Sequence, residues 1–182
     1  MFDNMFGLPT HALVVHATVG LVPVAALLAV VVAVWPAARR RYGWLSVVLL
    51  AVATVLVPLT TESGESLERR VPHSNLVEEH AELGDSLLNF VLPLLIVTVA
   101  LVLLARTGQR NKADGAPGGA TSACPPRPGW LRFAVPVVAA VTVLLGIGAV
   151  VQVVRIGHSG AKAVWSDTAK TASGGGEHED GD

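Results

Sequence analysis

Charge is scarce in this sequence of 182 residues, since only 15% of them are Asp, Glu, Lys or Arg whereas 52% are hydrophobic. Cysteine is nearly absent as well. Cys124 stands alone, which excludes an internal disulfide and any metal cage built from several cysteines. A mean hydropathy of +0.56 with so little charge is atypical of a soluble domain and points to a lipid bilayer.

Four segments contain no Asp, Glu, Lys or Arg, and each is long enough to cross about 30 Å of hydrocarbon as a helix. In lipid a spanning segment has to satisfy its own backbone hydrogen bonds, and a helix does so. The leader Met1–Thr10 lacks Lys and Arg, so we expect the first span to remain rather than to be cleaved as a signal. We predict an all-α integral membrane four-helix bundle over residues 1–166, with spans at about 12–35, 42–60, 86–105 and 133–154.

Consecutive spans cross the membrane in opposite directions, so every second connection lies on the same side. Lysine and arginine are distributed unequally between the two sides. The side of the 36–41 and 106–132 connections carries eight of them, and the side of both termini and the 61–85 connection carries five. Because basic residues favour the cytoplasm, we predict a multi-pass protein of the cell membrane with both termini outside. By composition, residues 107–129 form a flexible cytoplasmic linker and residues 167–182 a disordered acidic tail.

All six histidines fall on the predicted outer side, and five of them precede the acidic tail: His11, His16, His73, His80 and His158. Asn75 and Glu78 have the spacing of a capping box, so we expect the third helix to begin near residue 75. His16 lies five residues beyond His11, and His80 lies five residues beyond Asn75. These two histidines are therefore predicted to lie at matching depth on parallel helices.

Glycine follows each member of this deep pair four residues later, at Gly20 and Gly84, on the same helical face. The gap can admit a flat ligand such as a porphyrin, or it can admit a neighbouring helix, because small residues are common where membrane helices pack. Asp85 and Asn89 enter the third apolar window, and we expect them to pair inside the bundle.

Three classes of function are compatible with these residues. The leading hypothesis is a haem b-binding electron-transfer module, with His16 and His80 as axial ligands and Arg155 beside a haem propionate. The second is an outer-face Zn or Cu site, with or without enzymatic activity, drawn from His11, His16, His80, His158, Glu62 and Glu82. A weaker enzymatic variant pairs Ser159 with a histidine as nucleophile and base.

The third class is a structural or partner subunit in which histidines form interhelical hydrogen bonds or titrate as a pH sensor, without a cofactor. The partners that these hypotheses admit are the lipid bilayer, a redox partner or membrane complex, and a second copy of the chain. We expect no nucleic-acid partner.

Four short motifs resemble the bacterial membrane-protein family called domain of unknown function 2231, over about residues 8–166. They are the His-x4-His pattern of His11 and His16, the segment Glu62–Glu68, the segment Glu78–Gly84, and Arg155–Ala161 followed by Val164-Trp165. Ser63 and Ala12 depart from the threonine and proline that are frequent in the family. The resemblance implies four spans and draws attention to His11, His16, His80 and His158, but it implies no established activity.

Overall fold

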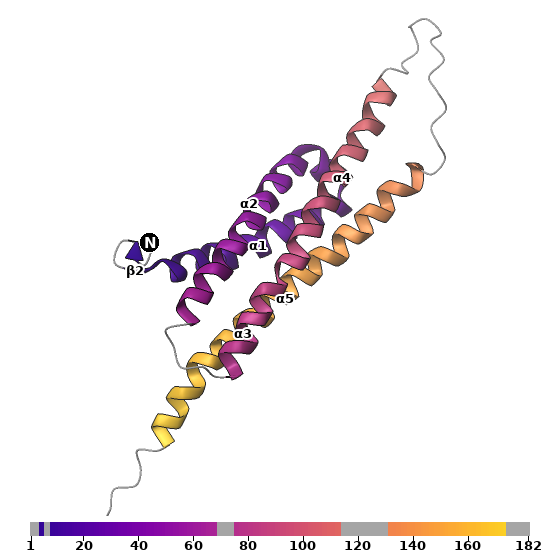
Figure 1. Cartoon of the computed structure of the whole chain (residues 1–182). Helices are drawn as coiled ribbons and strands as arrows, with labels where there is room; N and C mark the ends of the chain where they lie inside the picture. The colour runs from indigo at the N-terminus through magenta and orange to yellow at the C-terminus, as the bar shows by residue number, and fades with distance from the viewer. Residues whose placement is uncertain (1–3, 6–7, 69–74, 114–130, 174–182) are drawn as a thin grey trace, which may run out of the picture.

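The computed structural model describes residues 4–5, 8–68, 75–113 and 131–173, and Figure 1 shows their arrangement. A two-residue antiparallel ladder precedes five helices. The elements are β1 (Asn4–Met5), β2 (Leu8–Pro9), α1 (Thr10–Val34), α2 (Pro36–Glu68), α3 (Asn75–Ser86), α4 (Leu88–Ala113) and α5 (Leu131–Ser173).

Four stretches of helix are long and apolar enough to cross a membrane. They are Val14–Val34, Pro36–Glu65, Asn75–Thr107 and Phe133–Lys162. Each overlaps one predicted span, and the third combines α3 with α4. Helices α1, α2, α4 and α5 pack in that order around the bundle, and α1 lies diagonally opposite α4 (Figure 1). The predicted all-α membrane architecture is therefore present.

The interior of the bundle is filled largely by small and β-branched side chains. One cluster is centred on the alanines of α1, Ala25, Ala26 and Ala29, together with Leu50 and Leu94. Large apolar side chains point outward from every spanning helix, as Leu27, Val55, Ile96 and Leu144 do. A surface this apolar suits hydrocarbon and would be unusual for a water-soluble bundle.

The first connection between spans is shorter than predicted. Residues 36–41, expected as a loop, are helical, and α1 and α2 are separated only by Trp35. Proline at the first position of α2 explains this, because its fixed φ suits a helix start and its missing N–H is not needed there. At its other end α2 continues to Glu68, so the motif at residues 62–68 is helical rather than a turn.

Among the other helices, one begins where it is predicted to begin and two continue further along the chain than composition alone indicates. Helix α3 begins at Asn75, as the capping-box pattern predicts. Helix α4 continues to Ala113, into the predicted linker, and α5 continues to Ser173, into the predicted tail. The remainder of the linker, residues 114–129, and of the tail, residues 174–182, lies outside the described residues.

Aromatic and basic side chains mark one end of the bundle, where α1 meets α2. The guanidinium carbon of Arg41 lies 5.6 Å from the centroid of the Tyr42 ring, and that of Arg106 lies 5.1 Å from the Trp44 ring. Such pairs are typical of the boundary between lipid and water. We refer to this end, which contains Arg39, as the Arg39 end, and to the opposite end, which contains α3, as the His80 end.

Candidate functional site: the α3–α5 seam

The third span is not one continuous helix, because a turn at Leu87 separates α3 from α4. The amide of Leu87 donates to the Gly84 carbonyl at 3.1 Å, one residue nearer than the regular helical partner. This shift releases the Leu83 carbonyl from the helical ladder. The hydroxyl of Ser86 donates to that carbonyl at 2.7 Å.

Gln152 of α5 completes the hydrogen bonding at this break. Its side-chain amide donates to the Leu83 carbonyl at 3.1 Å and to the Ser86 hydroxyl at 2.6 Å. The glutamine is 4% exposed, so an unpaired amide here would be costly. A polar residue in the middle of an apolar span is thus explained by a break in the neighbouring helix.

His80 makes the second contact between these helices, nearer the end of the bundle. Its Nδ1 lies 3.0 Å from the hydroxyl oxygen of Ser159. Its ring lies against Gly160, where an added Cβ would come within 2.9 Å of the imidazole Cε1. Only glycine lets the imidazole lie this close to the backbone of α5.

The hydroxyl of Ser159 favours Nδ1 as the ring nitrogen that carries the proton in a neutral His80. That hydroxyl donates to the carbonyl of Ile156 at 2.9 Å, so its oxygen is free to accept from Nδ1–H. A neutral imidazole held in this way carries its lone pair on Nε2. We call the group His80, Leu83, Ser86, Gln152, Ser159 and Gly160 the α3–α5 seam.

Nucleophilic chemistry is disfavoured by the same hydrogen bonds, although Ser159 and His80 are close enough to form a nucleophile–base pair. The serine is 7% exposed and donates its proton to its own helix. Within the described residues, no carboxylate orients the His80 imidazole. The geometry therefore makes Ser159 a group that positions His80.

The structure does not bring His16 to the same place as His80. Thr18, two residues further along α1, is buried and its hydroxyl lies 2.7 Å from that of Thr60 on α2. Residues two apart on a helix point to nearly opposite sides, and His16 is accordingly exposed. Gly20 shares the exposed side, and an added Cβ there would meet nothing within 4 Å.

The remaining predicted ligands are dispersed. Glu62, Glu82, Arg155 and His158 are exposed, the side chain of His11 lies outside the described part, and so does the whole of His73. Among the side chains that the structure describes, no three of His, Cys, Asp and Glu lie close enough together to hold a metal ion. The Zn or Cu set is thus not assembled in this part of the chain.

Asp85 and Asn89 differ from the expectation that they pair inside the bundle, because both are exposed. The physical reason is the direction of Leu87, which is 6% exposed and faces the core. Residues two positions to either side of Leu87 on a helical path point away from that core. Both side chains consequently lie on the outer surface of the third span.

Sequence reasoning gave Gln152 and Gly160 no role in the site and considered Ser159 only as a nucleophile. One signal was available for two of them, since Gln152 and Ser159 are seven residues apart and share a helical face. The close approach at Gly160 depends on the position of α3 and has no signature of its own in the sequence.

A four-span helical membrane protein is the class that this fold and this seam define. The chain matches the family described as predicted membrane protein, domain of unknown function 2231, over residues 7–173, and it belongs to that family. The resemblance inferred from the motifs is thereby confirmed. Neither a curated protein nor a solved structure matches the chain.

Proposed function

We propose that the α3–α5 seam is a haem b site in which His80 supplies an axial ligand, and that the chain is an electron-transfer subunit of the membrane. A single observation carries the proposal: Nδ1 of His80 lies 3.0 Å from the Ser159 hydroxyl, and a proton on Nδ1 leaves the lone pair on Nε2. Histidines that bind metals commonly donate their other ring N–H to a neighbouring acceptor, which fixes the tautomer and the ring orientation. Haem iron cycles between ferric and ferrous states and so carries one electron at a time.

The space beside His80 supports a flat ligand. Gly84 lies one helical turn from His80, and an added Cβ there would meet nothing within 4 Å. Other glycines are in close contact, since a Cβ at Gly148 would lie 3.1 Å from the Phe90 ring. Of the two readings of Gly84, an open gap is therefore favoured over the packing of a neighbouring helix.

The charge at the His80 end also suits the propionates of a haem. Arg155 lies one turn from Ser159 along α5 and is exposed, so its guanidinium is available to a propionate. His16 faces away from the bundle on α1, and its participation requires a haem that reaches that outer surface. The proposal for His80 does not depend on His16.

Reduced-minus-oxidised spectra of the full chain, expressed with haem supply and purified in detergent, test the proposal. We expect a b-type band that is lost in His80→Ala and retained in His158→Ala, which removes an exposed histidine from the same end. Ser159→Ala should retain haem but shift its midpoint potential, because the hydrogen bond to the ligand is lost. A change of spin state in His16→Ala would identify His16 as the second ligand. A haem-free wild-type protein would refute the proposal.

A second candidate function, a structural subunit without a cofactor, is favoured by the fit of the His80 ring against Gly160. In that case His80 serves only to join α3 to α5. His80→Ala would then lower the thermal stability of a haem-free protein, and Gly160→Leu would do the same by displacing the ring. Wild-type protein with no haem band, combined with these two losses, would establish this alternative.

A further inference from the structure

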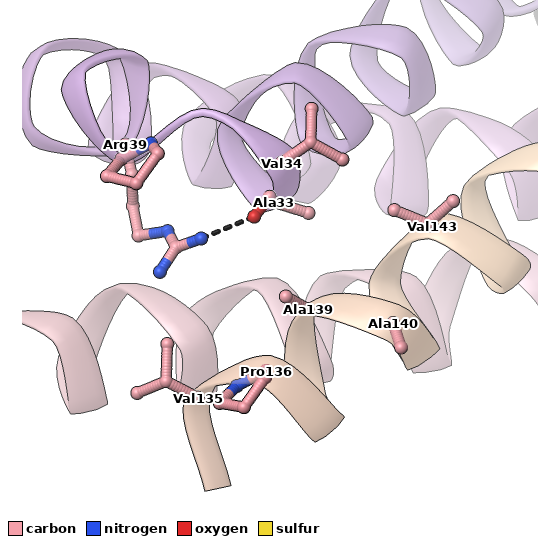
Figure 2. A pocket seen from close by; sticks show the side chains of 9 residues that line it. Ala33, Val34, Arg39, Val135, Pro136, Ala139, Ala140 and Val143 are labelled. Atoms are coloured by element: carbon pink, nitrogen blue, oxygen red, sulfur yellow. Dashed lines mark hydrogen bonds between the residues drawn. The ribbon is translucent and has the colours of Figure 1, made fainter. Parts of the chain in front are cut away.

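An apolar cleft of about 440 Å³ opens at the Arg39 end, far from the α3–α5 seam (Figure 2). Its walls come from the end of α1, the start of α2 and the first turns of α5. The lining residues are Ala33, Val34, Pro36, Arg39, Val135, Pro136, Ala139, Ala140 and Val143. This volume falls in the range of small-molecule sites, roughly 300–1,000 Å³.

The cleft lies beyond a point where α5 and α1 pack tightly. At Gly146 the two helices are in tight contact, since an added Cβ would lie 2.7 Å from Cγ2 of Val30 and 3.3 Å from the Ala26 carbonyl oxygen. Two turns nearer the start of α5, alanines and a proline line the cleft, and these small side chains leave the space between the helices unfilled. The result is a wedge with apolar walls that a flexible hydrocarbon chain can occupy.

One cation lies at the mouth of this wedge. The guanidinium of Arg39 donates from Nε to the Val32 carbonyl at 2.9 Å and from Nη2 to the Ala33 carbonyl. Figure 2 shows its other terminal nitrogen turned away from Ala33. A guanidinium has five N–H donors, so several stay available after these two bonds. In the described part of the chain, Arg39 forms no bond to a carboxylate.

The surroundings add further positive charge at the level of the lipid headgroups. Arg40 and Arg41 follow directly in sequence and are exposed. Trp35 and Trp44 are exposed nearby, as is usual for aromatic residues at the membrane boundary. A fixed cation above an apolar wedge is complementary to a molecule with an anionic head and a hydrocarbon tail.

We propose that this cleft binds an anionic phospholipid, with the phosphate on Arg39 and one acyl chain in the wedge between α1 and α5. The guanidinium fork suits phosphate, to which it donates two parallel hydrogen bonds. Arg39 already bridges the end of α1 to the start of α2, so a lipid held there ties three helices together. The site is a binding site for lipid and lies at the opposite end of the bundle from His80.

Binding of lipids to the full chain in detergent, counted by native mass spectrometry, tests this assignment. The probes are dioleoyl phosphatidylglycerol, its neutral counterpart dioleoyl phosphatidylcholine, and glycerol 3-phosphate, which has the head without the chains. We expect the wild type to bind phosphatidylglycerol about ten-fold more tightly than phosphatidylcholine, and Arg39→Gln to lose that preference. Arg40→Gln is the matched control, because it removes an adjacent charge that does not line the cleft.

A second variant tests the wedge with Arg39 intact. Ala140→Phe fills the cleft from an exposed position of α5, and we expect both lipids to bind about ten-fold more weakly. Leu144→Phe, one turn along the same exposed surface, is its control and should leave binding unchanged. Equal affinity of the wild type for the two lipids, equal losses in Arg39→Gln and Arg40→Gln, unchanged binding in Ala140→Phe, or competition by glycerol 3-phosphate as strong as by the lipid would each overturn the assignment.

Discussion

The two ends of α5 are held in different ways. At the His80 end, Gln152 and Ser159 form hydrogen bonds with α3, and buried polar atoms find partners. At the Arg39 end, an apolar cleft lies between the start of α5 and the end of α1. Because apolar side chains gain little by leaving lipid for another apolar surface, hydrogen bonds and close glycine contacts decide where membrane helices stay together. Where α5 has neither, a cleft separates it from its neighbour.

The largest expected difference between the two ends is in cysteine labelling, which should occur in intact spheroplasts at one end and not at the other. Cys124 lies in the connection that follows α4, on the predicted cytoplasmic side. We expect a membrane-impermeant maleimide to label it only after spheroplasts are lysed. Cys124→Ser combined with Ser173→Cys should give the opposite pattern, because that cysteine follows the other end of α5. Labelling of Cys124 in intact spheroplasts would mean that the His80 end faces the cytoplasm.

Gly146→Leu should give the largest loss of stability, since the position has no room for a side chain between α5 and α1. We expect the free energy of unfolding in detergent to fall by about 2–3 kcal/mol, as overpacking usually costs. Gly20→Leu is the matched control, because the space at Gly20 is open, and its free energy of unfolding should hardly change. Similar losses in both variants would show that side-chain size in the helix, rather than the contact at Gly146, decides the effect.

Gln152→Leu should weaken the His80 end to a smaller extent. It removes both amide hydrogen bonds at the break in the third span, for an expected cost of about 1–2 kcal/mol. Hydrogen exchange of the amides near Leu87 should accelerate more than that of amides in α1. Asn89→Leu changes an exposed amide on the same span and should leave both readouts as in the wild type.

The smallest effect concerns a hydroxyl nearer the Arg39 end. Ser46 is fully buried, and within the described part of the chain its Oγ has no hydrogen-bond partner. Ser46→Ala should therefore raise the thermal stability slightly, by up to about 1 kcal/mol in free energy. Thr98→Ala is the comparison, because the buried Thr98 hydroxyl donates to the Leu94 carbonyl and its loss should be destabilising. A decrease in Ser46→Ala would indicate a partner for that hydroxyl.

The number and position of the spans could be predicted from the sequence because lipid excludes charge, and the charge-free segments mark them directly. The directions in which side chains point could not be predicted in this way. Helix α1 is apolar on all sides, so no periodicity distinguishes the face of Thr18 from that of His16. The rotation of His16 about the helix axis was therefore not accessible from the sequence.

The break at Leu87 and the close contact at Gly160 were beyond the sequence for a related reason. The released Leu83 carbonyl accepts from the Ser86 hydroxyl and also from the amide of Gln152, which belongs to another span. Which helix supplies such a partner depends on how the spans are arranged. Neither a composition nor a local motif contains that information.

Helix α5 is much longer than a membrane span requires. Its 43 residues span about 65 Å at 1.5 Å per residue, about twice the hydrocarbon thickness of a bilayer. About 28 Å of continuous helix therefore follows Val154, where the charge-free segment ends. The exposed Trp165 lies on this part of α5. A partner that binds α5 near Ser173 would therefore contact the protein well outside the hydrocarbon, at a distance that the length of this helix sets.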